Sequence, residues 1–281
     1  MTTNTPLRMG RISYLNVLPI YHPLEAGWIK HNFQFVLGPP AELNALIRAD
    51  GLELGSCSSI EYARNPGRYF LLPDLAIASQ GPVKSVLLLS RIPPAELTGR
   101  ELLVTAESNT SAALLRIVLE KVYNVQPHFK LAPGSVSNAL ALGAKDPAVL
   151  AIGDEALALR HDPAFPYQLD LGEVWRDWTG LPFVFGVWVA RRKALTERPE
   201  DLREGARLLR ESKRMGVSAM EEVVSLTCQA KPNLSREELR RYYGHLCYDL
   251  GTREQEGLSR FFEYLAEHGI IEKAPELAIL D

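Results

Sequence analysis

The sequence predicts an α/β fold of two lobes, with the second lobe inserted into the first. The chain has 281 residues, more than one small hydrophobic core usually serves and about right for two lobes. Short apolar runs alternate with helical patterns through most of it, which is typical of βα units and a mostly parallel sheet. Two long β-rich runs, 83–90 and 183–190, are bordered by turn residues. We expect these two runs to carry the chain between the lobes.

The predicted elements follow in chain order. Strands are expected at 11–15, 52–57, 83–90, 101–105, 149–152 and 183–190, and helices are expected to begin near Pro40, Ser59, Thr110, Val136 and Asp154. After about Arg191 the apolar residues recur at helical spacing, with no convincing strand between them. Late helices are expected at 199–215, 217–230, 235–246 and 252–269. The last third of the chain is therefore predicted to be helical.

The positions of the two long strands predict the domain boundaries. We expect residues 1–89 and 187–281 to form lobe 1, residues 90–186 to form the inserted lobe 2, and a ligand cleft to lie between the lobes. A lobe inserted through two crossings is the usual connection of a hinged cleft that closes on a ligand. The pattern alone leaves open one continuous doubly wound domain with two buried strands.

The charge balance indicates what kind of partner to expect. The formal net charge is −3 and the sequence pI is near 6.1, so no overall basic field attracts nucleic acid or an anionic membrane. We expect a small-molecule partner, no nucleic acid and no membrane. An anionic ligand would then be held by local donors such as helix N-termini and hydroxyl groups. The sequence does not choose between a monomer and a dimer.

The N-terminal segment and the cysteines predict a cytoplasmic protein. Residues 1–9 form a short polar segment that leads directly into a predicted strand, with no cationic start, long apolar stretch or small-residue cleavage site. The three cysteines, Cys57, Cys228 and Cys247, are widely spaced and fit reduced thiols better than a disulfide framework. No apolar run is long enough to span a bilayer.

Polar residues follow several predicted strands, at the positions where open α/β sheets bind their ligands. The candidates of the first lobe and of the first crossing are Ser13, Tyr14, Asn16, Ser56, Ser58, Ser59, Lys84 and Ser85. Those of the inserted lobe are Ser108, Asn109, Thr110, Ser111, Asp154 and Glu155. The run 107–111 precedes a strong helix, so its backbone N–H groups offer a seat for a carboxylate.

Each of these candidates also has a structural explanation. Asn109 or Thr110 is a natural N-cap, and Asn16 can serve as a turn residue just past a strand. Asp154 is favoured as a helix cap, because a carboxylate facing an anionic ligand would repel it unless it bonds a hydroxyl group. The pattern alone therefore indicates a small polar or carboxylated ligand and leaves the roles open.

Other chemistries lack their motifs. The histidines are scattered, with no His-x-x-x-His or Cys-x-x-Cys spacing, so we expect no metal. No glycine-rich phosphate loop follows a strand, and no Gly-x-Ser-x-Gly elbow is present. We expect the protein to use no cofactor.

Several strings, taken together and in order, resemble the chorismate dehydratase family. They are GRISYLNVLP at 10–19, LPDLAIASQGPVKSV at 72–86, SNTS at 108–111, IGDEAL at 152–157, DLGEVW at 170–175 and WTGLPFVFGVW at 178–188. No single string decides the resemblance, but the ordered set is specific and spans roughly residues 8–191. The late helices are compatible with the family but less distinctive.

The resemblance implies a fold, a reaction and a set of site residues. The fold would be the two-lobed periplasmic-binding-protein-like fold of type II. The reaction would be the loss of water from chorismate to give 3-[(1-carboxyvinyl)oxy]benzoate, at the entry of the futalosine route to menaquinone. By motif, Asn16 and Ser85 match the family's proposed active-site asparagine and serine, and Thr110 and Ser111 match its carboxylate-binding turn.

Two alternatives remain at this point. The sister enzyme 1,4-dihydroxy-6-naphthoate synthase has the same fold but resembles a different pattern, with a histidine where residues 152–154 stand here. A non-catalytic solute receptor would need export or a lipid anchor, and neither a signal nor a lipobox cysteine is visible.

Overall fold

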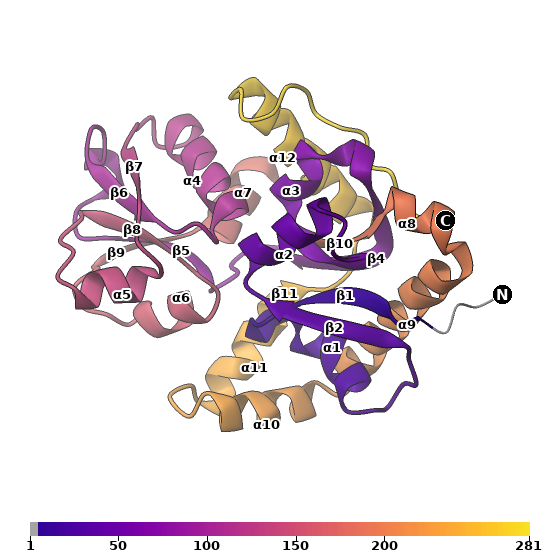
Figure 1. The fold of residues 1–281 in the computed structure, drawn as a ribbon. Coiled ribbons are helices and arrows are strands. Elements are labelled where there is room, and N and C mark those ends of the chain that lie inside the picture. Colours follow the sequence, from indigo (N-terminus) through magenta and orange to yellow (C-terminus); the bar gives the residue numbers. More distant parts are fainter. Residues whose placement is uncertain (1–4) are drawn as a thin grey trace. The chain divides into compact units, whose positions relative to one another are not determined.

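Two mixed β-sheets with flanking helices make up the chain in a computed structural model that describes residues 5–281 (Figure 1). The first four positions of the segment in which we expect no export signal lie outside the described residues. The contacts divide the chain into two compact units. The first unit comprises the chain through Ala78, Val184–Gln255 and Pro275–Asp281, and the second comprises Ser79–Phe183 and Glu256–Ala274.

These unit boundaries differ from the predicted ones. The predicted first lobe included residues 79–89, but β5 (Val86–Ser90) pairs with two strands of the second sheet and belongs to the second unit. The chain instead leaves the first unit at the end of β4 (Tyr69–Ser79) and returns inside β10 (Phe183–Arg191). Strand pairing therefore decides the boundary, and periodicity along the chain does not reveal it.

The sheet of the first unit has the strand order β11-β4-β10-β3-β1-β2. β1 runs parallel to both β2 and β3, and β10 runs antiparallel to β3. Besides β4 and β10, the sheet contains β1 (Leu7–Ile12), β2 (Phe33–Gly38), β3 (Leu54–Ser58) and β11 (Leu246–Cys247). The sheet is thus mixed, because the returning strand enters it from the opposite direction.

The helices of the first unit come from both ends of the chain. The early ones are the 3₁₀ turn η1 (Leu15–Val17), α1 (Leu18–Glu25), α2 (Pro40–Arg48), α3 (Ser59–Arg64) and the 3₁₀ turn η2 (Pro66–Arg68). The late ones are α8 (Arg192–Glu197), α9 (Pro199–Ser218), α10 (Met220–Ala230), α11 (Arg236–His245) and the start of α12 (Thr252–Glu267). The predicted helical character of the last third is confirmed.

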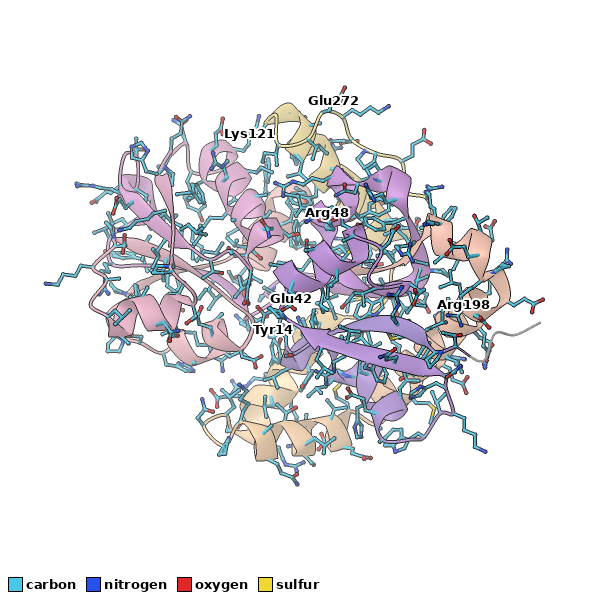
Figure 2. All side chains as sticks on the ribbon, viewed as in Figure 1. Tyr14, Glu42, Arg48, Lys121, Arg198 and Glu272 are labelled. Atoms are coloured by element: carbon cyan, nitrogen blue, oxygen red, sulfur yellow. The ribbon has the colours of Figure 1, made fainter. Side chains whose placement is uncertain are left out.

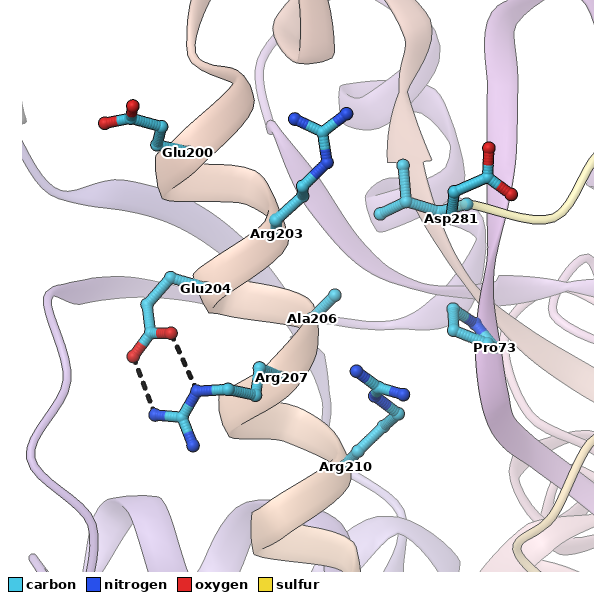
Figure 3. Close-up of a pocket in the computed structure, with 9 residues that line it drawn as sticks. Pro73, Glu200, Arg203, Glu204, Ala206, Arg207, Arg210 and Asp281 are labelled. Atoms are coloured by element: carbon cyan, nitrogen blue, oxygen red, sulfur yellow. Dashed lines mark hydrogen bonds and ion pairs between the residues drawn. The ribbon is translucent and has the colours of Figure 1, made fainter.

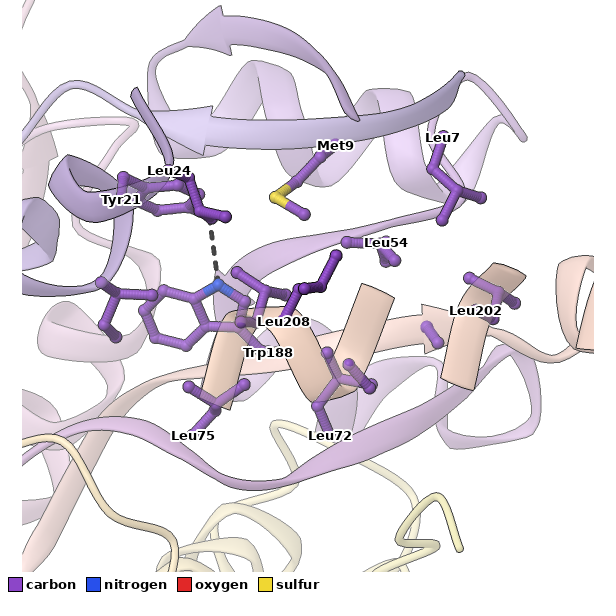
Figure 4. Close-up of a cluster of buried hydrophobic side chains, with 14 of the residues drawn as sticks. Leu7, Met9, Tyr21, Leu24, Leu54, Leu72, Leu75, Trp188, Leu202 and Leu208 are labelled. Atoms are coloured by element: carbon purple, nitrogen blue, oxygen red, sulfur yellow. Dashed lines mark hydrogen bonds between the residues drawn. The ribbon is translucent and has the colours of Figure 1, made fainter. Parts of the chain in front are cut away.

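A buried aromatic pair lies at the centre of the first unit's core (Figure 4). The Trp188 Nε1–H donates to the Tyr21 hydroxyl at 3.1 Å, and that hydroxyl donates to the Gly10 carbonyl at 2.9 Å. Burial raises the pKa of Tyr21 to about 12, so the phenol keeps the proton that it donates to β1. This chain of bonds joins β10, α1 and β1, and Met9 and Leu54 pack into the same core.

The sheet of the second unit has the strand order β7-β6-β8-β5-β9. Its other strands are β6 (Glu101–Val104), β7 (His128–Leu131), β8 (Ala148–Ile152) and β9 (Tyr167–Asp170). β6 is parallel to β7 and β8, whereas β5 is antiparallel to β8 and β9. The helices are the 3₁₀ turn η3 (Pro94–Glu96), α4 (Asn109–Lys121), α5 (Val136–Ala141), α6 (Gly153–Leu159), α7 (Leu171–Thr179) and most of α12.

The helix α12 joins the second unit through aromatic packing. Phe261 lies edge-on to both Trp175 and Phe183, with ring centroids 6.2 and 4.9 Å apart. Tyr264 stacks on Trp178 at 4.6 Å. This packing explains why a helix at the end of the chain belongs with residues from its middle.

In the described part of the chain, no helix combines the length and apolar character needed to cross a membrane. All three cysteines are free thiols.

Helices α1 and α9 approach so closely that one glycine is required between them. A Cβ atom on Gly216 would lie 1.8 Å from the Pro19 carbonyl oxygen. Nearby, the Ser212 hydroxyl donates to the Ile20 carbonyl at 2.5 Å. The helix α1 directly follows the turn that carries Asn16. The contacts that hold α1 against α9 therefore also help to fix the position of that turn.

We expect Gly216→Ala to lower the free energy of unfolding by roughly 1–3 kcal/mol, because backbone must move to admit the methyl group. Gly244→Ala is the matched control: it also lies in a helix, it is exposed, and nothing lies within 4 Å of its added Cβ. That variant should be neutral or more stable by about 0.5–1 kcal/mol. Urea unfolding of both variants measures the difference, and equal stabilities would contradict the close packing.

Candidate functional site

The carboxyl ends of β1 and β3 lie at one edge of the first sheet. The two strands are parallel, with Met9 opposite Leu54. The antiparallel β10 begins at the same edge, where Gly186 pairs with Ser58. We call residues 13–16, 58–59 and 184–186 the first carboxyl edge.

Asn16 lies in the 3₁₀ turn that follows β1, and its amide has an unused acceptor. The residue is half-buried, yet its Oδ1 is shielded from solvent and has no hydrogen-bond partner in the described part of the chain. A buried acceptor left unpaired costs about 1–3 kcal/mol. Such a cost is understandable at a site that a ligand donor completes.

The turn around Asn16 is held in place by the C-terminal helices. The neighbouring Leu15 carbonyl accepts a hydrogen bond from the Tyr243 hydroxyl at 3.1 Å. The same hydroxyl lies 2.8 Å from Thr227 Oγ1. Tyr14, labelled in Figure 2, precedes the turn and is half-buried. The Asn16 amide is therefore presented on a turn with fixed backbone.

The two serines after β3 have different surroundings. Ser58 accepts a hydrogen bond from Asn44 Nδ2 at 3.1 Å, which leaves the Ser58 hydroxyl proton for another acceptor. Ser59 is fully buried, and its hydroxyl donates to the Val184 carbonyl at 2.5 Å. Ser59 therefore fastens α3 to β10. The buried Asn44, on α2, is a site neighbour that no sequence signal indicated.

The second sheet gathers most of the remaining candidates at one edge. β6, β8 and β9 end there, and β5, which runs the other way, begins there. We call residues 83–85, 105–111, 152–155 and 170–173 the second carboxyl edge. The predicted site residues of the inserted lobe, together with Ser85, belong to it.

Ser85 sits in a segment fixed by one buried carboxylate. The Asp170 carboxylate accepts the backbone N–H groups of Val83 at 3.0 Å and Lys84 at 2.8 Å. It also accepts those of Gly172 and Glu173, at 3.1 and 3.3 Å, at the start of α7. Ser85 is 2% exposed, and its carbonyl accepts the Gly153 N–H at 2.7 Å. Sequence reasoning did not single out Asp170, although Asp170-x-x-Glu173 has the form of a capping motif.

The start of α4 has no side-chain cap. The N-cap residue is Ser108, not Asn109 or Thr110, and it donates its hydroxyl hydrogen to the Thr105 carbonyl at 2.7 Å. The exposed Asn109 side chain donates to the Ala106 carbonyl at 3.0 Å. Thr110 and Ser111 are buried in the first turn. Since the first N–H groups of a helix have no partner inside it, this terminus is suited to an anion.

Asp154 does not cap α6 as predicted. The helix begins at Gly153, whose φ of 57° turns the chain sharply, and the N-cap position is Ile152. Asp154 is half-buried in the first turn. Its carboxylate lies near the positive end of the helix and adds negative charge there.

Two surface cavities contain none of the predicted site residues. One, of about 500 Å³, lies along α9 and is lined by Pro73, Glu200, Arg203, Glu204, Ala206, Arg207, Arg210, Leu280 and Asp281 (Figure 3). There Arg207 is bound to Glu204 and Glu211, at 2.7 Å each. The other, of about 540 Å³, lies at the amino end of β6, where Lys130 pairs with Glu101 and Asp146. Neither is at a carboxyl edge.

Within residues 5–281, no three His, Cys, Asp or Glu side chains gather in a way that could hold a metal ion. Burial raises the pKa of the Cys57 thiol well above its usual range, so this cysteine beside the first edge stays protonated.

Comparison with known proteins identifies the family of the chain. A family model described as menaquinone biosynthesis matches residues 7–267. A chorismate dehydratase from Thermus thermophilus is 31% identical over 275 residues, covering 92% of this chain and 95% of that protein. The chain belongs to the chorismate dehydratase family of menaquinone biosynthesis. A chorismate dehydratase from Campylobacter jejuni is 28% identical and covers 90% of this chain and 94% of its own.

Solved structures agree on the fold. A protein from Archaeoglobus fulgidus matches with a TM-score of 0.76 at 18% identity, covering 95% of this chain and 98% of that one. A Candida albicans protein described as having the generic periplasmic binding protein fold matches with a TM-score of 0.70 at 10% identity, covering 98% and 97%. The alkanesulfonate-binding protein SsuA from Xanthomonas axonopodis matches with 0.69 at 15% identity, covering 99% and 97%. The predicted periplasmic-binding-protein-like fold is confirmed.

The Asp170 carboxylate should be required for stability of the second unit. In Asp170→Asn one oxygen becomes an amide that faces backbone N–H donors, so we expect a loss of about 1–3 kcal/mol. Asp177→Asn, on the same helix but exposed, is the control and should change stability by less than about 0.5 kcal/mol. Chemical unfolding of both variants tests this, and an unchanged Asp170→Asn would show that the four N–H bonds are not needed.

Proposed function

We propose that this chain eliminates water from chorismate to give 3-[(1-carboxyvinyl)oxy]benzoate. The main support for this proposal is the similarity to a chorismate dehydratase along 95% of that protein's length. The chemistry of the two carboxyl edges is compatible with it: one offers an unused amide acceptor, and the other offers an uncapped helix N-terminus beside buried hydroxyl groups.

The reaction asks little of an enzyme beyond positioning and polarisation. The hydrogen at C3 of chorismate is acidified through the conjugated ring carboxylate, and loss of the C4 hydroxyl makes the ring aromatic. Charge builds up on the ring carboxylate as the C3 proton leaves. Donors that are already in place for this charge lower the barrier without having to reorganise.

We assign the charge-stabilising role to the second carboxyl edge. The first N–H groups of α4 and the hydroxyl groups of Thr110 and Ser111 would hold the substrate carboxylate. Ser108 and Asn109 would support this turn through their bonds to Thr105 and Ala106. Asp154 would repel a carboxylate, so it would bind the substrate only through the C4 hydroxyl group, sharing the single proton of that group with Asn16.

Asn16 and Ser85 would orient the leaving hydroxyl group. The unpaired Asn16 Oδ1 is an acceptor, which suits a hydroxyl donor and not a carboxylate. Ser58, whose hydroxyl proton has no partner in the described residues, would be a second binding group. The fully buried Ser59 has its proton committed to Val184 and would act only by positioning α3.

The substrate's own enolpyruvyl carboxylate would serve as the base. It would take the C3 proton, the C4–O bond would break, and the departing hydroxide would recover the proton to leave as water. The carboxylate is regenerated, so no protein group changes its protonation state. This scheme needs no cofactor, and no histidine belongs to either carboxyl edge.

The proposed setting is the cytoplasm, at the entry of the futalosine route to menaquinone. The free thiols Cys57, Cys228 and Cys247 are compatible with a reducing compartment. The partner would be the small-molecule substrate alone, with no nucleic acid and no membrane.

Purified protein incubated with chorismate should remove its diene absorbance and form a product 18 mass units lighter, the mass of one water. Asn16→Ala and Ser85→Ala should each lower kcat by roughly 100- to 1,000-fold while folding normally. Asn233→Ala and Ser225→Ala remove the same groups away from both carboxyl edges and should keep full turnover. Dehydration at the normal rate by both site variants would refute their assignment.

The double variant tests whether both residues act on one substrate group. Asn16 belongs to the first unit and Ser85 to the second. If both orient the same hydroxyl, the double variant should lose less activity than the product of the two single losses. Strictly multiplicative losses would mean that they act independently.

A further inference from the structure

Lys84 has a backbone conformation that lysine rarely adopts. Its φ is 61°, in the left-handed region. The other non-glycine residues with positive φ in the described part of the chain are Asp50, Asp74 and Asn124. Asp and Asn tolerate this region because their short side chains can bond the local backbone. Lysine has no such means, so the conformation at Lys84 must be imposed by its surroundings.

The imposing contacts lie on both sides of the residue. Asp170 Oδ2 accepts the Lys84 N–H at 2.8 Å, and Oδ1 accepts the Val83 N–H at 3.0 Å. On the other side, the Ser85 carbonyl is held by the Gly153 N–H at 2.7 Å. Backbone strain that the rest of the structure over-determines in this way is concentrated at functional sites.

The charge of Lys84 is unusual at this edge. In the described part of the chain, no carboxylate pairs with its ammonium group. The other charged residues of the second carboxyl edge are all acidic: Glu107, Asp154, Asp170, Glu173 and Glu155. An anionic ligand at such an edge needs a cation to offset the repulsion. Lys84 is the one basic residue among these segments.

We propose that Lys84 binds a carboxylate of the substrate and that Asp170 positions it by clamping its left-handed backbone. The inference rests on the proposed function, since it concerns the same substrate. The proposal adds a charged side chain to a proposed set of hydroxyl and amide binding groups. It also explains why a lysine is found at position 84, where asparagine or glycine would fit the backbone with less strain.

The test uses Lys84→Asn, which removes the charge but suits the left-handed conformation. Chorismate binding is measured by calorimetry, turnover by loss of the diene absorbance, and stability by urea unfolding. We expect affinity to fall roughly 10- to 100-fold, the effect of losing one hydrogen bond to a charged group. The unfolding midpoint should stay the same or rise. Lys84→Arg should retain part of the affinity.

Lys145→Asn is the matched control. Lys145 is an exposed lysine of the same unit, away from the second carboxyl edge, so this variant alters the net charge equally. It should bind and turn over chorismate as the parent does. Equal losses in both variants would mean that net charge, and not a contact made by Lys84, is responsible, which would overturn the assignment.

The outcomes separate this inference from the proposed function. If the parent binds and dehydrates chorismate and Lys84→Asn does so within twofold, the Lys84 assignment alone is wrong. If the parent binds chorismate without dehydrating it, the proposed function is wrong, and the binding data still decide the role of Lys84. If the parent neither binds nor dehydrates it, both are overturned.

Discussion

One carboxylate organises the carboxyl edge of the second unit. Asp170 is 7% exposed and meets four backbone N–H groups, two before β5 and two in the first turn of α7. Backbone N–H donors can stabilise a buried carboxylate as a cationic side chain would, and they also fix geometry. Through this one residue, the chain that enters the second unit is tied to the helix that precedes its exit. A Cβ on Gly172 would lie 2.5 Å from the Gly81 carbonyl oxygen, so the start of α7 and the segment before β5 are in direct backbone contact and leave no room for a side chain at Gly172.

In the first unit, the backbone at the candidate site is held by hydroxyl groups of later helices and not by a carboxylate. Its critical turn carries Asn16, and the contacts that fix it come from helices more than 190 positions later in the chain, through Tyr243 and Ser212. The late helices therefore do more than cover a sheet: they hold the backbone that displays an unsatisfied amide. The candidate site motifs all lie before residue 191, and the helices after that residue support one of them, the turn that carries Asn16.

The sequence pattern predicted helices whose formation depends mainly on neighbouring residues. The predicted starts of α2 at Pro40 and of α3 at Ser59, and the four predicted late helices, are confirmed, because they depend on the spacing of apolar residues along the chain. β4 was not predicted because Pro73 and Asp74 look like a turn, and Asp74 indeed has a φ of 59° inside the strand. β5 was predicted as a strand but assigned to lobe 1, since its partners are set by pairing across distant segments.

The same limit applies to the site. Asn16, Ser85 and the 108–111 turn could be named from the strings that resemble the family. The hydrogen bond from Ser59 to Val184, and the lack of a partner for Asn16 Oδ1 among the described residues, depend on tertiary contacts that spacing along the sequence does not encode. Asp170-x-x-Glu173 has the form of a capping motif, but the bonds of Asp170 to Val83 and Lys84 join positions 87 and 86 residues apart, respectively.

Four helices of the second unit, α4, α5, α6 and α7, differ in how their N-termini are satisfied, and this difference favours one of them for an anion. α7 is closed by Asp170, and α5 is closed by the Ser135 hydroxyl, which accepts the Asn138 N–H at 3.1 Å. α6 carries Asp154 and Glu155 in its first turn. α4 has neither a side-chain cap nor an acidic residue in its first turn. Since a carboxylate is repelled by acidic first turns, and side-chain caps already bond N–H groups of α5 and α7, the first turn of α4 is the least unfavourable of the four for a carboxylate.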